Sequence, residues 1–236
     1  MLTIEKTVLP SVEQMEIVIE GMRNPLNSWA KSDSRIAWLC NYDDEVNSKE
    51  DEVLIIGEAD NALMMKLAKA GSVHAKYRRM LPVWVTLTAP LYFLKELDTY
   101  KVGTVANSCS TMHKITERDL TIDDFSHEHL TDWSHDGELC RDWYGDLEDI
   151  IDDINFAREK YLETNDKKYW WQIIQLLPSS YNQKRTLMLN YEVLAAIYRD
   201  RKNHKLDEWH AFCDWIESLP NSEIITGDRE DENEKG

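Results

Sequence analysis

The hydrophobic and polar positions of the first half of the chain predict a mixture of strands and helices. Residues 12–21, VEQMEIVIEG, predict a strand, and residues 83–89, VWVTLTA, predict a second one from their β-branched and aromatic side chains. Residues 60–71, DNALMMKLAKAG, predict a helix with Asp60 as N-cap and Gly71 as C-cap. Pro90 permits a helix to begin at once, over residues 91–97.

The second half of the chain has mainly helical periodicity. Residues 101–108, KVGTVANS, still predict an extended segment or a strand-like loop. From Leu147 onwards, apolar positions recur at helical spacing in four segments, residues 147–163, 167–177, 185–201 and 207–219. In the third segment, one helix face would contain Leu187, Asn190, Leu194, Ile197, Tyr198 and Arg201. We therefore expect an α+β fold with one domain over residues 1–220 and a disordered polar tail over 221–236.

Composition and charge exclude several classes of protein. The formal net charge is −17, which argues against a general nucleic-acid binder, because such proteins need a basic face. No apolar run approaches the length that crosses a membrane, and the N-terminal residues lack the apolar core of a signal peptide. The four cysteines, Cys40, Cys109, Cys140 and Cys213, form no CxxC pair, so we expect reduced thiols in a cytoplasmic protein.

The positive charges are unevenly distributed. Residues 61–95 contain no Asp or Glu, and they contain six cations: Lys66, Lys69, Lys76, Arg78, Arg79 and Lys95. A second group of cations has only Glu192 and Asp200 beside it in the sequence, and its members are Lys184, Arg185, Arg199, Arg201, Lys202 and Lys205. These groups together predict a local site for a small phosphorylated ligand. Solvated surface charge is the alternative interpretation.

Residues 89–111 change from a strand and a short helix into a run of small, hydroxyl-bearing residues, and this segment resembles a known family. The stretch VANSCSTMH is similar to the Ser-x-Asn-Glu-x-Ser-x-Arg-Tyr motif of the flavin-dependent thymidylate synthases, with Asn107 and Ser110 at matching positions. His74 precedes it as the family's histidine does. In the second half, Pro178 lies twelve residues before Asn190, and Arg201 falls on a matching position. The resemblance extends over residues 71–219.

The chain departs from the family pattern at its phosphate-binding cations. The family's Arg-His-Arg triplet corresponds here to residues 99–101 or 100–102, and only Lys101 of these is charged. The Glu and Arg of the following motif are replaced by Ser108 and Met112. Another family Arg is replaced by Ile174, and a family Glu by Arg79. The cations that would replace the lost ones are Arg78, Arg79, Lys101, Lys184 or Arg185.

The resemblance implies a single α+β domain with an antiparallel sheet and an enzyme that acts on a pyrimidine nucleotide. It implies FAD as cofactor, methylenetetrahydrofolate as one-carbon donor, methylation at C5 of a nucleotide such as dUMP, and a homotetramer with its site between subunits. Ser110 and Arg201 would bind the nucleotide and act in catalysis. The cofactor-binding residues would be His74, Arg78, Arg79, Lys101, Asn107 and Asn190. The resemblance implies no metal.

Other functions remain open from the sequence. His127, His129, His135 and Cys140 lie within fourteen residues, but their spacing matches no standard zinc pattern. Cys109 and His113 are a candidate nucleophile and base. A relative without flavin or without catalysis is the third alternative, either as a nucleotide-binding or an oligomeric interaction protein. An enzyme that modifies another pyrimidine nucleotide, or transfers a hydroxymethyl group, is a related alternative.

Overall fold

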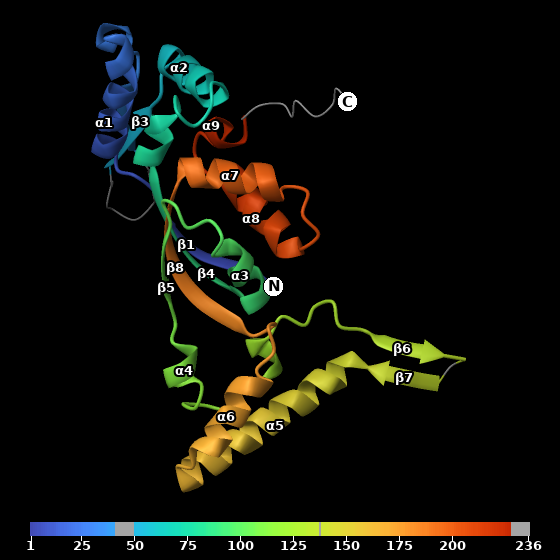
Figure 1. Ribbon diagram of the computed structural model, residues 1–236. Helices are drawn as coiled ribbons and strands as arrows, with labels where there is room; N and C mark the ends of the chain where they lie inside the picture. The colour runs from blue at the N-terminus through green and yellow to red at the C-terminus, as the bar shows by residue number, and fades with distance from the viewer. Residues whose placement is uncertain (41–49, 137, 228–236) are drawn as a thin grey trace.

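A four-stranded antiparallel sheet forms the centre of the molecule, in the order β1-β4-β8-β5. The computed structural model describes residues 1–40, 50–136 and 138–227. The strands are β1 (Thr3–Val8), β4 (Pro82–Pro90), β8 (Asn182–Asn190) and β5 (Val105–Ser108). Helices α3 (Leu91–Leu97), α7 (Tyr191–Arg201) and α8 (Asp207–Glu217) lie on one face of this sheet, as Figure 1 shows. The predicted α+β fold with an antiparallel sheet is confirmed.

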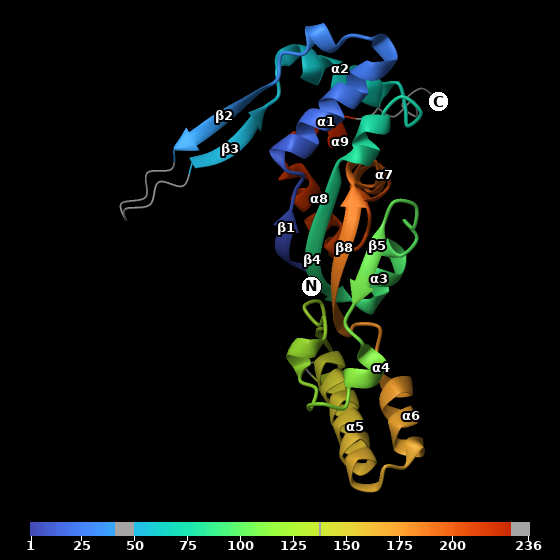
Figure 2. The ribbon, with the colours of Figure 1, turned by 90° about the vertical axis from the view of Figure 1, so that its left-hand side faces the viewer.

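The other face of the sheet is uncovered in Figure 2, where the strands lie in front of α3 and α8. Alternation along the strands assigns each residue to a face. Val83, Val85 and Leu87 of β4 are buried against the helices, as are Leu187 and Leu189 of β8. Cross-strand partners therefore form rows on the open face, and one apolar row consists of Val8, Trp84, Met188 and Val105.

Two further regions extend from the sheet at opposite ends of the molecule (Figure 1). One end contains α1 (Val12–Arg23), the 3₁₀ turns η1 (Asn24–Leu26), η2 (Trp29–Lys31) and η3 (Lys76–Met80), the hairpin β2 (Arg35–Cys40) and β3 (Glu50–Ile55), α2 (Glu58–Lys69) and α9 (Glu223–Thr226). The other end contains α4 (Thr111–Lys114), η4 (Ile122–Asp124), the hairpin β6 (Asp132–His135) and β7 (Glu138–Asp142), α5 (Trp143–Thr164) and α6 (Lys167–Leu176).

The buried apolar residues form two separate clusters. The larger one fills the space between the sheet, α1, α2, α7, α8 and α9, and includes Phe93, Trp209 and Phe212. The smaller one lies beneath α5 and α6 and includes Phe125, Ile154 and Ile173. The predicted helices 147–163, 167–177 and 207–219 supply these cores and are confirmed, as are the predicted strand 83–89 and the helix 91–97. In the segment 101–108, residues 105–108 form the strand β5, and residues 101–104 form a loop with a turn at Gly103.

The predicted strand over residues 12–21 is wrong, because these residues form α1. Ser11 caps this helix: its hydroxyl accepts from the Gln14 backbone N–H, and the Gln14 side chain accepts from the Ser11 N–H. This reciprocal pair is a capping box and fixes the start of a helix. Val18, Ile19 and Met22 are then buried on one helical face.

The predicted single helix over residues 185–201 is also wrong, because its first part is β8. Residues 182–190 pair with β4 on one side, and residues 185–188 pair with β5 on the other, so the sheet decides their conformation. The helix begins only at Tyr191. The predicted common face of Leu187, Asn190, Leu194, Ile197, Tyr198 and Arg201 therefore does not exist.

The predicted caps of α2 and the predicted tail need smaller corrections. Gly57, not Asp60, is the N-cap of α2, and Ala70 is its C-cap, followed by Gly71 with a φ of 97°. In the segment predicted as a disordered tail, residues 223–226 form α9 with Ile224 and Ile225 buried. Residues 228–236 of that predicted tail lie outside the described residues.

Asp60 is instead the centre of a buried polar network. The Arg23 Nε atom donates to Asp60 Oδ1 at 2.5 Å, and both side chains are almost fully buried. The other oxygen of Asp60 accepts from the hydroxyls of Ser32 and Ser34 and from the backbone N–H groups of Asp33 and Ser34. Burial alone would raise the pKa of Asp60, but the hydrogen bonds from Ser34, Ser32 and Arg23 outweigh it and lower the pKa to about 2. This network connects α1, α2 and the loop between them.

We predict that Asp60→Asn lowers the free energy of unfolding by about 3–5 kcal/mol, because it leaves the Arg23 charge buried and unpaired. Urea denaturation followed by circular dichroism would measure the change. Asp153→Asn is the control, since Asp153 is exposed on α5, and it should change stability by no more than about 0.5 kcal/mol. Equal effects of the two variants would contradict this role of Asp60.

The same carboxylate predicts a dependence of stability on pH. Its pKa is depressed in the folded state from 3.8 to about 2, so its contribution is complete above the unfolded value. That contribution is lost as the pH falls from about 4 towards 2. Unfolding free energies measured over this range should therefore decrease more steeply for the native chain than for Asp60→Asn.

Candidate functional site

The loop between α3 and β5 contains Lys101 and lies against the beginning of α7. Gly103 has a φ of 83°, and a Cβ atom there would lie 2.7 Å from Asn190 Nδ2 and 3.2 Å from Val193 Cγ2. Only glycine fits this approach. Asn190 is the N-cap of α7, and its Oδ1 accepts from the Val193 backbone N–H at 3.0 Å. The structure therefore brings Asn190 and the loop that contains Lys101 together.

A pocket of about 350 Å³ lies beside this loop. It is lined by Leu97, Asp98, Tyr100, Lys101, Thr104, Ala106 and Leu187. The Thr104 hydroxyl oxygen is buried and has no hydrogen-bond partner within the described parts of the chain. A buried hydroxyl without a partner costs free energy unless a ligand or water supplies one. An exposed lysine and an unsatisfied hydroxyl suit a polar, negatively charged ligand.

A second pocket, of about 510 Å³, contains His74. Its lining includes Gly71, Ser72 and His74 from the loop after α2, and Glu192 and Arg199 from α7. The predicted cations adjoin it: Arg79 donates to the Ser72 carbonyl at 3.3 Å, and buried Arg78 forms an ion pair with Glu192 at 3.5 Å. Sequence analysis placed Arg199 only in the second group of cations and did not assign Glu192 to a site. Their seven-residue spacing on one helix was the available signal.

The Arg201 side chain forms contacts within the chain and is not among the residues that line either pocket. Its Nη1 donates to Glu96 Oε2 at 3.1 Å, and its Nε donates to the Tyr100 hydroxyl at 3.0 Å. Trp209 Nε1 donates to the same Glu96 oxygen at 2.9 Å, and the guanidinium carbon lies 4.9 Å from the Trp209 ring centre. Burial raises the pKa of Tyr100, although the hydrogen bond from Arg201 opposes this. In this arrangement Arg201 positions Tyr100, which lines the smaller pocket.

Asn107 and Ser110 lie along the exposed edge of the sheet. Asn107 is paired with Thr186 of β8, and Ser110 caps α4 by accepting from the His113 N–H at 3.3 Å. Gln183 Nε2 holds the turn between them by donating to the Cys109 carbonyl at 2.9 Å. Both predicted site residues are accessible, but neither is among the residues that line the two pockets described above.

The predicted anion site at the second group of cations is not supported, because four of these six side chains already form ion pairs with carboxylates of the chain. Lys184 pairs with Glu5, Arg185 with Asp98, Arg199 with Asp200 and Arg201 with Glu96. The cations are spread over β8 and α7 and neutralised locally. The sequence showed few acidic neighbours because three of these carboxylates, Glu5, Asp98 and Glu96, lie far away along the chain and come close only in the fold.

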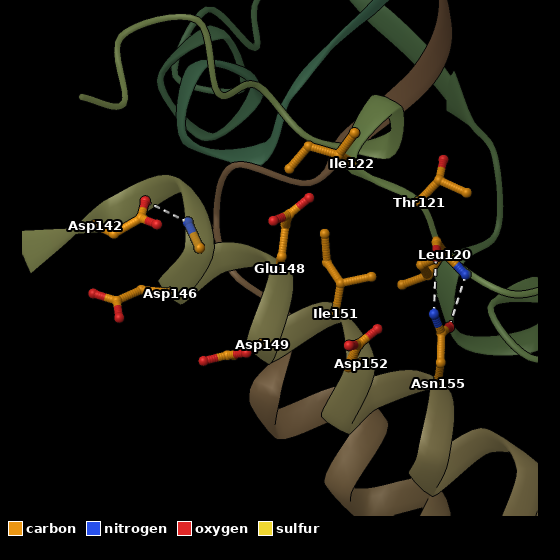
Figure 3. A pocket seen from close by; sticks show the side chains of 11 residues that line it. Leu120, Thr121, Ile122, Asp142, Asp146, Glu148, Asp149, Ile151, Asp152 and Asn155 are labelled. Carbon is orange, nitrogen blue, oxygen red and sulfur yellow. Dashed lines mark hydrogen bonds between the residues drawn. The ribbon is translucent and has the colours of Figure 1, made fainter. Parts of the chain in front are cut away.

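The largest pocket described, of about 650 Å³, is acidic and lies between η4 and α5 (Figure 3). Its carboxylates are Asp142, Asp146, Glu148, Asp149 and Asp152. Asn155 fixes one wall by accepting from the Leu120 N–H and donating to the Leu120 carbonyl. In a chain with a net charge of −17, this concentration of negative charge repels phosphate groups. It does not suit an anionic nucleotide.

The residues of the alternative metal site make separate contacts. His127 Nδ1 lies 2.9 Å from the Phe125 carbonyl, His129 pairs with Asp207, and His135 with Asp136. Within the described residues, no group of three or more potential ligands could hold a metal ion. In the same residues, no helix is both long and apolar enough to cross a membrane.

Comparison with known proteins gives a match in structure but none in sequence. No family model and no curated protein matches the chain. A crystal structure of thymidylate synthase X from Helicobacter pylori with FAD and dUMP superposes with a TM-score of 0.61 and 14% identity, over 96% of this chain and 97% of that chain. The fold is that of the flavin-dependent thymidylate synthases. The UMP/dUMP methylase PolB from Streptomyces cacaoi, bound with 5-Br dUMP, gives 0.57 and 13%, over 96% and 94%.

We predict that Arg201→Met lowers the free energy of unfolding by about 1–3 kcal/mol, because Glu96 loses a charged hydrogen-bond donor. Arg199→Met is the matched control on the same helix. Its guanidinium is exposed and pairs only with the adjacent Asp200 in the described contacts, so the change should stay within about 0.5 kcal/mol. Denaturant titration would compare the two variants. An unchanged free energy of unfolding in Arg201→Met would show that the contacts with Glu96 do not stabilise the fold.

Proposed function

We propose that the chain is a divergent flavin-dependent thymidylate synthase that transfers a one-carbon group to C5 of a pyrimidine deoxynucleotide such as dUMP. The observation that supports this most is the superposition over 96% of the chain on a thymidylate synthase that was crystallised with FAD and dUMP. The UMP/dUMP methylase with the same fold supports the substrate class. Because identity is 14% or less, the activity itself is our proposal.

The pocket beside the Lys101 loop would hold part of a flavin nucleotide. Lys101 would neutralise a phosphate, and the buried Thr104 hydroxyl would gain the hydrogen-bond partner that it lacks in the described structure. Tyr100, held by Arg201, would donate or accept a third hydrogen bond. The flavin would supply the redox chemistry, and the protein would supply position and electrostatics. Asn190, which lies beside Gly103, would also contact the flavin.

The pocket at His74 would hold part of the folate or of the flavin. His74 is exposed at its edge, and Glu192, fixed by Arg78, presents a carboxylate from α7. Arg79 adds positive charge nearby, and Arg199, which pairs with Asp200, lines the same pocket. Methylenetetrahydrofolate as donor remains a prediction from the family resemblance, as do the roles of Ser110 and Arg201 in catalysis. The homotetramer and the cytoplasmic location remain predictions as well.

A non-catalytic relative is the second candidate, and one observation favours it. The cations of β8 and the end of α7 are occupied by Glu5, Asp98 and Glu96, so the described chain offers few cations for the phosphates of two nucleotides. Such a protein would keep the fold and a nucleotide pocket without the flavin chemistry.

We predict that the purified chain binds FAD and that dUMP perturbs the flavin absorbance. Lys101→Ala should weaken FAD binding about tenfold, since it removes one charged contact worth roughly 1.4 kcal/mol. Lys95→Ala is the matched control: Lys95 is an exposed lysine on α3 outside the pocket lining, and its removal should leave the affinity unchanged. Absorbance and fluorescence titration would measure both.

Retained flavin together with methylation of dUMP in the presence of methylenetetrahydrofolate would support the synthase. Flavin binding without methyl transfer would point to another pyrimidine substrate or donor. A folded chain that binds no flavin would overturn the synthase proposal and leave the non-catalytic relative.

A further inference from the structure

Another pocket, of about 340 Å³, lies at the end of the molecule where α1 and β3 are side by side (Figure 1). Its volume falls within the roughly 300–1,000 Å³ that small-molecule sites occupy. One wall is a face of α1, and the other is formed by Trp29, the loop after it and Leu54 of β3. None of its residues lines the pocket beside the Lys101 loop or the pocket at His74, so it is a separate site.

The buried side chain of Arg23 lines this pocket and is only partly satisfied. Its Nε atom donates to Asp60, and its Nη1 atom donates to the carbonyl and the hydroxyl of Ser28 at 3.3 Å. The side chain is only 4% exposed, and its Nη2 atom has no acceptor in the part of the chain that the structure describes. A buried N–H group without an acceptor costs free energy, which a carbonyl group of a ligand would recover.

The charges around Arg23 favour an uncharged acceptor over an anion. The Asp60 carboxylate already neutralises the guanidinium charge. Glu16 and Glu20 are exposed on the α1 wall of the pocket, and neither forms an ion pair within the described residues. Their negative charges would repel a phosphate or a carboxylate. The oxygen that accepts from Nη2 should therefore belong to a neutral carbonyl group.

Glu20 supplies the second half of a recognition pattern. It precedes Arg23 by three residues on α1, and side chains at this spacing are neighbours on a helix. The pocket thus presents N–H donors from Arg23 next to carboxylate oxygens from Glu20. A complementary ring edge carries one carbonyl followed by two N–H groups, as guanine does with its 6-carbonyl, N1–H and 2-amino group. Adenine lacks the carbonyl, and uracil would direct a second carbonyl at the carboxylate.

Trp29 offers a flat surface for such a ring. Its Nε1 atom donates to Asn24 Oδ1 at 2.7 Å, which fixes the indole, and 47% of the residue is exposed. Nucleobases stack on aromatic side chains, because both have a flat π-face. Ile19 and Leu54 add apolar contacts from the two walls. The pocket therefore combines a stacking surface with polar groups in a defined order.

We propose that this pocket binds a guanine base. The ring stacks on Trp29, its 6-carbonyl accepts from Arg23 Nη2, and its N1–H and 2-amino groups donate to the Glu20 carboxylate. Because the carboxylates of α1 repel phosphate, the nucleoside is the better probe of the site than the nucleotide. The site does not depend on flavin binding or methyl transfer, so its failure would leave the proposed function unaffected.

Calorimetric titration of the purified chain with guanosine, inosine and adenosine would test the site. Guanosine should bind with the highest affinity. Inosine lacks the 2-amino group and should bind about tenfold more weakly, since it loses one hydrogen bond to a charged group. Adenosine has an amino group in place of the 6-carbonyl and should show no measurable binding. Absence of guanosine binding, or equal affinities for guanosine and adenosine, would overturn the proposal.

Two variants at exposed positions would locate the base. Glu20→Ala should weaken guanosine binding about a hundredfold and inosine binding about tenfold, because guanosine loses two hydrogen bonds to the carboxylate and inosine loses one. The two nucleosides should then bind about equally. Trp29→Ala should weaken both about tenfold through lost stacking and keep their ratio.

Glu13→Ala is the matched control, since Glu13 is an exposed acid on α1 outside the pocket lining, and it should leave both affinities unchanged. Circular dichroism and urea denaturation would verify that each variant is folded. Guanosine binding that neither Glu20→Ala nor Trp29→Ala weakens would place the base elsewhere and reject the proposal.

Discussion

The pairing of β8 with strands on both sides is the constraint on which the rest of the structure depends. Its nine residues complete the ladder between β4 and β5, and its last residue, Asn190, caps α7. The strand thus fixes where α7 begins, and α7 in turn contributes Glu192 and Arg199 to one pocket and Arg201 to the support of the other. A shift of β8 by one residue would reverse its buried and exposed faces and move every one of these groups.

Local signals in the sequence predicted most elements, and the two failures have different causes. The strand 83–89 and the helices after Leu147 have strong periodicity, and they form as expected. Residues 185–190 contain Leu and Met, which are good helix formers, but two neighbouring strands hold them extended. Residues 12–21 have strand-like β-branched residues, yet the capping box at Ser11 begins a helix. In the first case the deciding partners were strands distant in sequence, whereas in the second the deciding signal was local, at Ser11 and Gln14.

The candidate site was predictable only in part for a similar reason. Lys101, Asn190 and His74 were predicted as site residues because they stand at positions that correspond to motifs of the family. The contacts of Glu96 with Arg201 and of Asp98 with Arg185 join residues about a hundred positions apart, and no periodicity reveals them. Because of these ion pairs, Arg185 and Arg201 hold parts of the fold together and are not free cations for a ligand. Thr104 belongs to the run of small, hydroxyl-bearing residues seen in the sequence, but the burial of its hydroxyl oxygen depends on the folded loop.

The separation of the two apolar clusters has a consequence for the dynamics of the chain. The cluster beneath α5 and α6 shares no residue with the larger one, and the acidic pocket lies at its surface. A region with its own small core opens with its own free energy, which is lower than that of global unfolding. We therefore expect the amide hydrogens of α5 and α6 to exchange through a local opening that the central sheet does not share. Negative charges crowded on that surface add self-repulsion, so this opening should become easier as ionic strength falls.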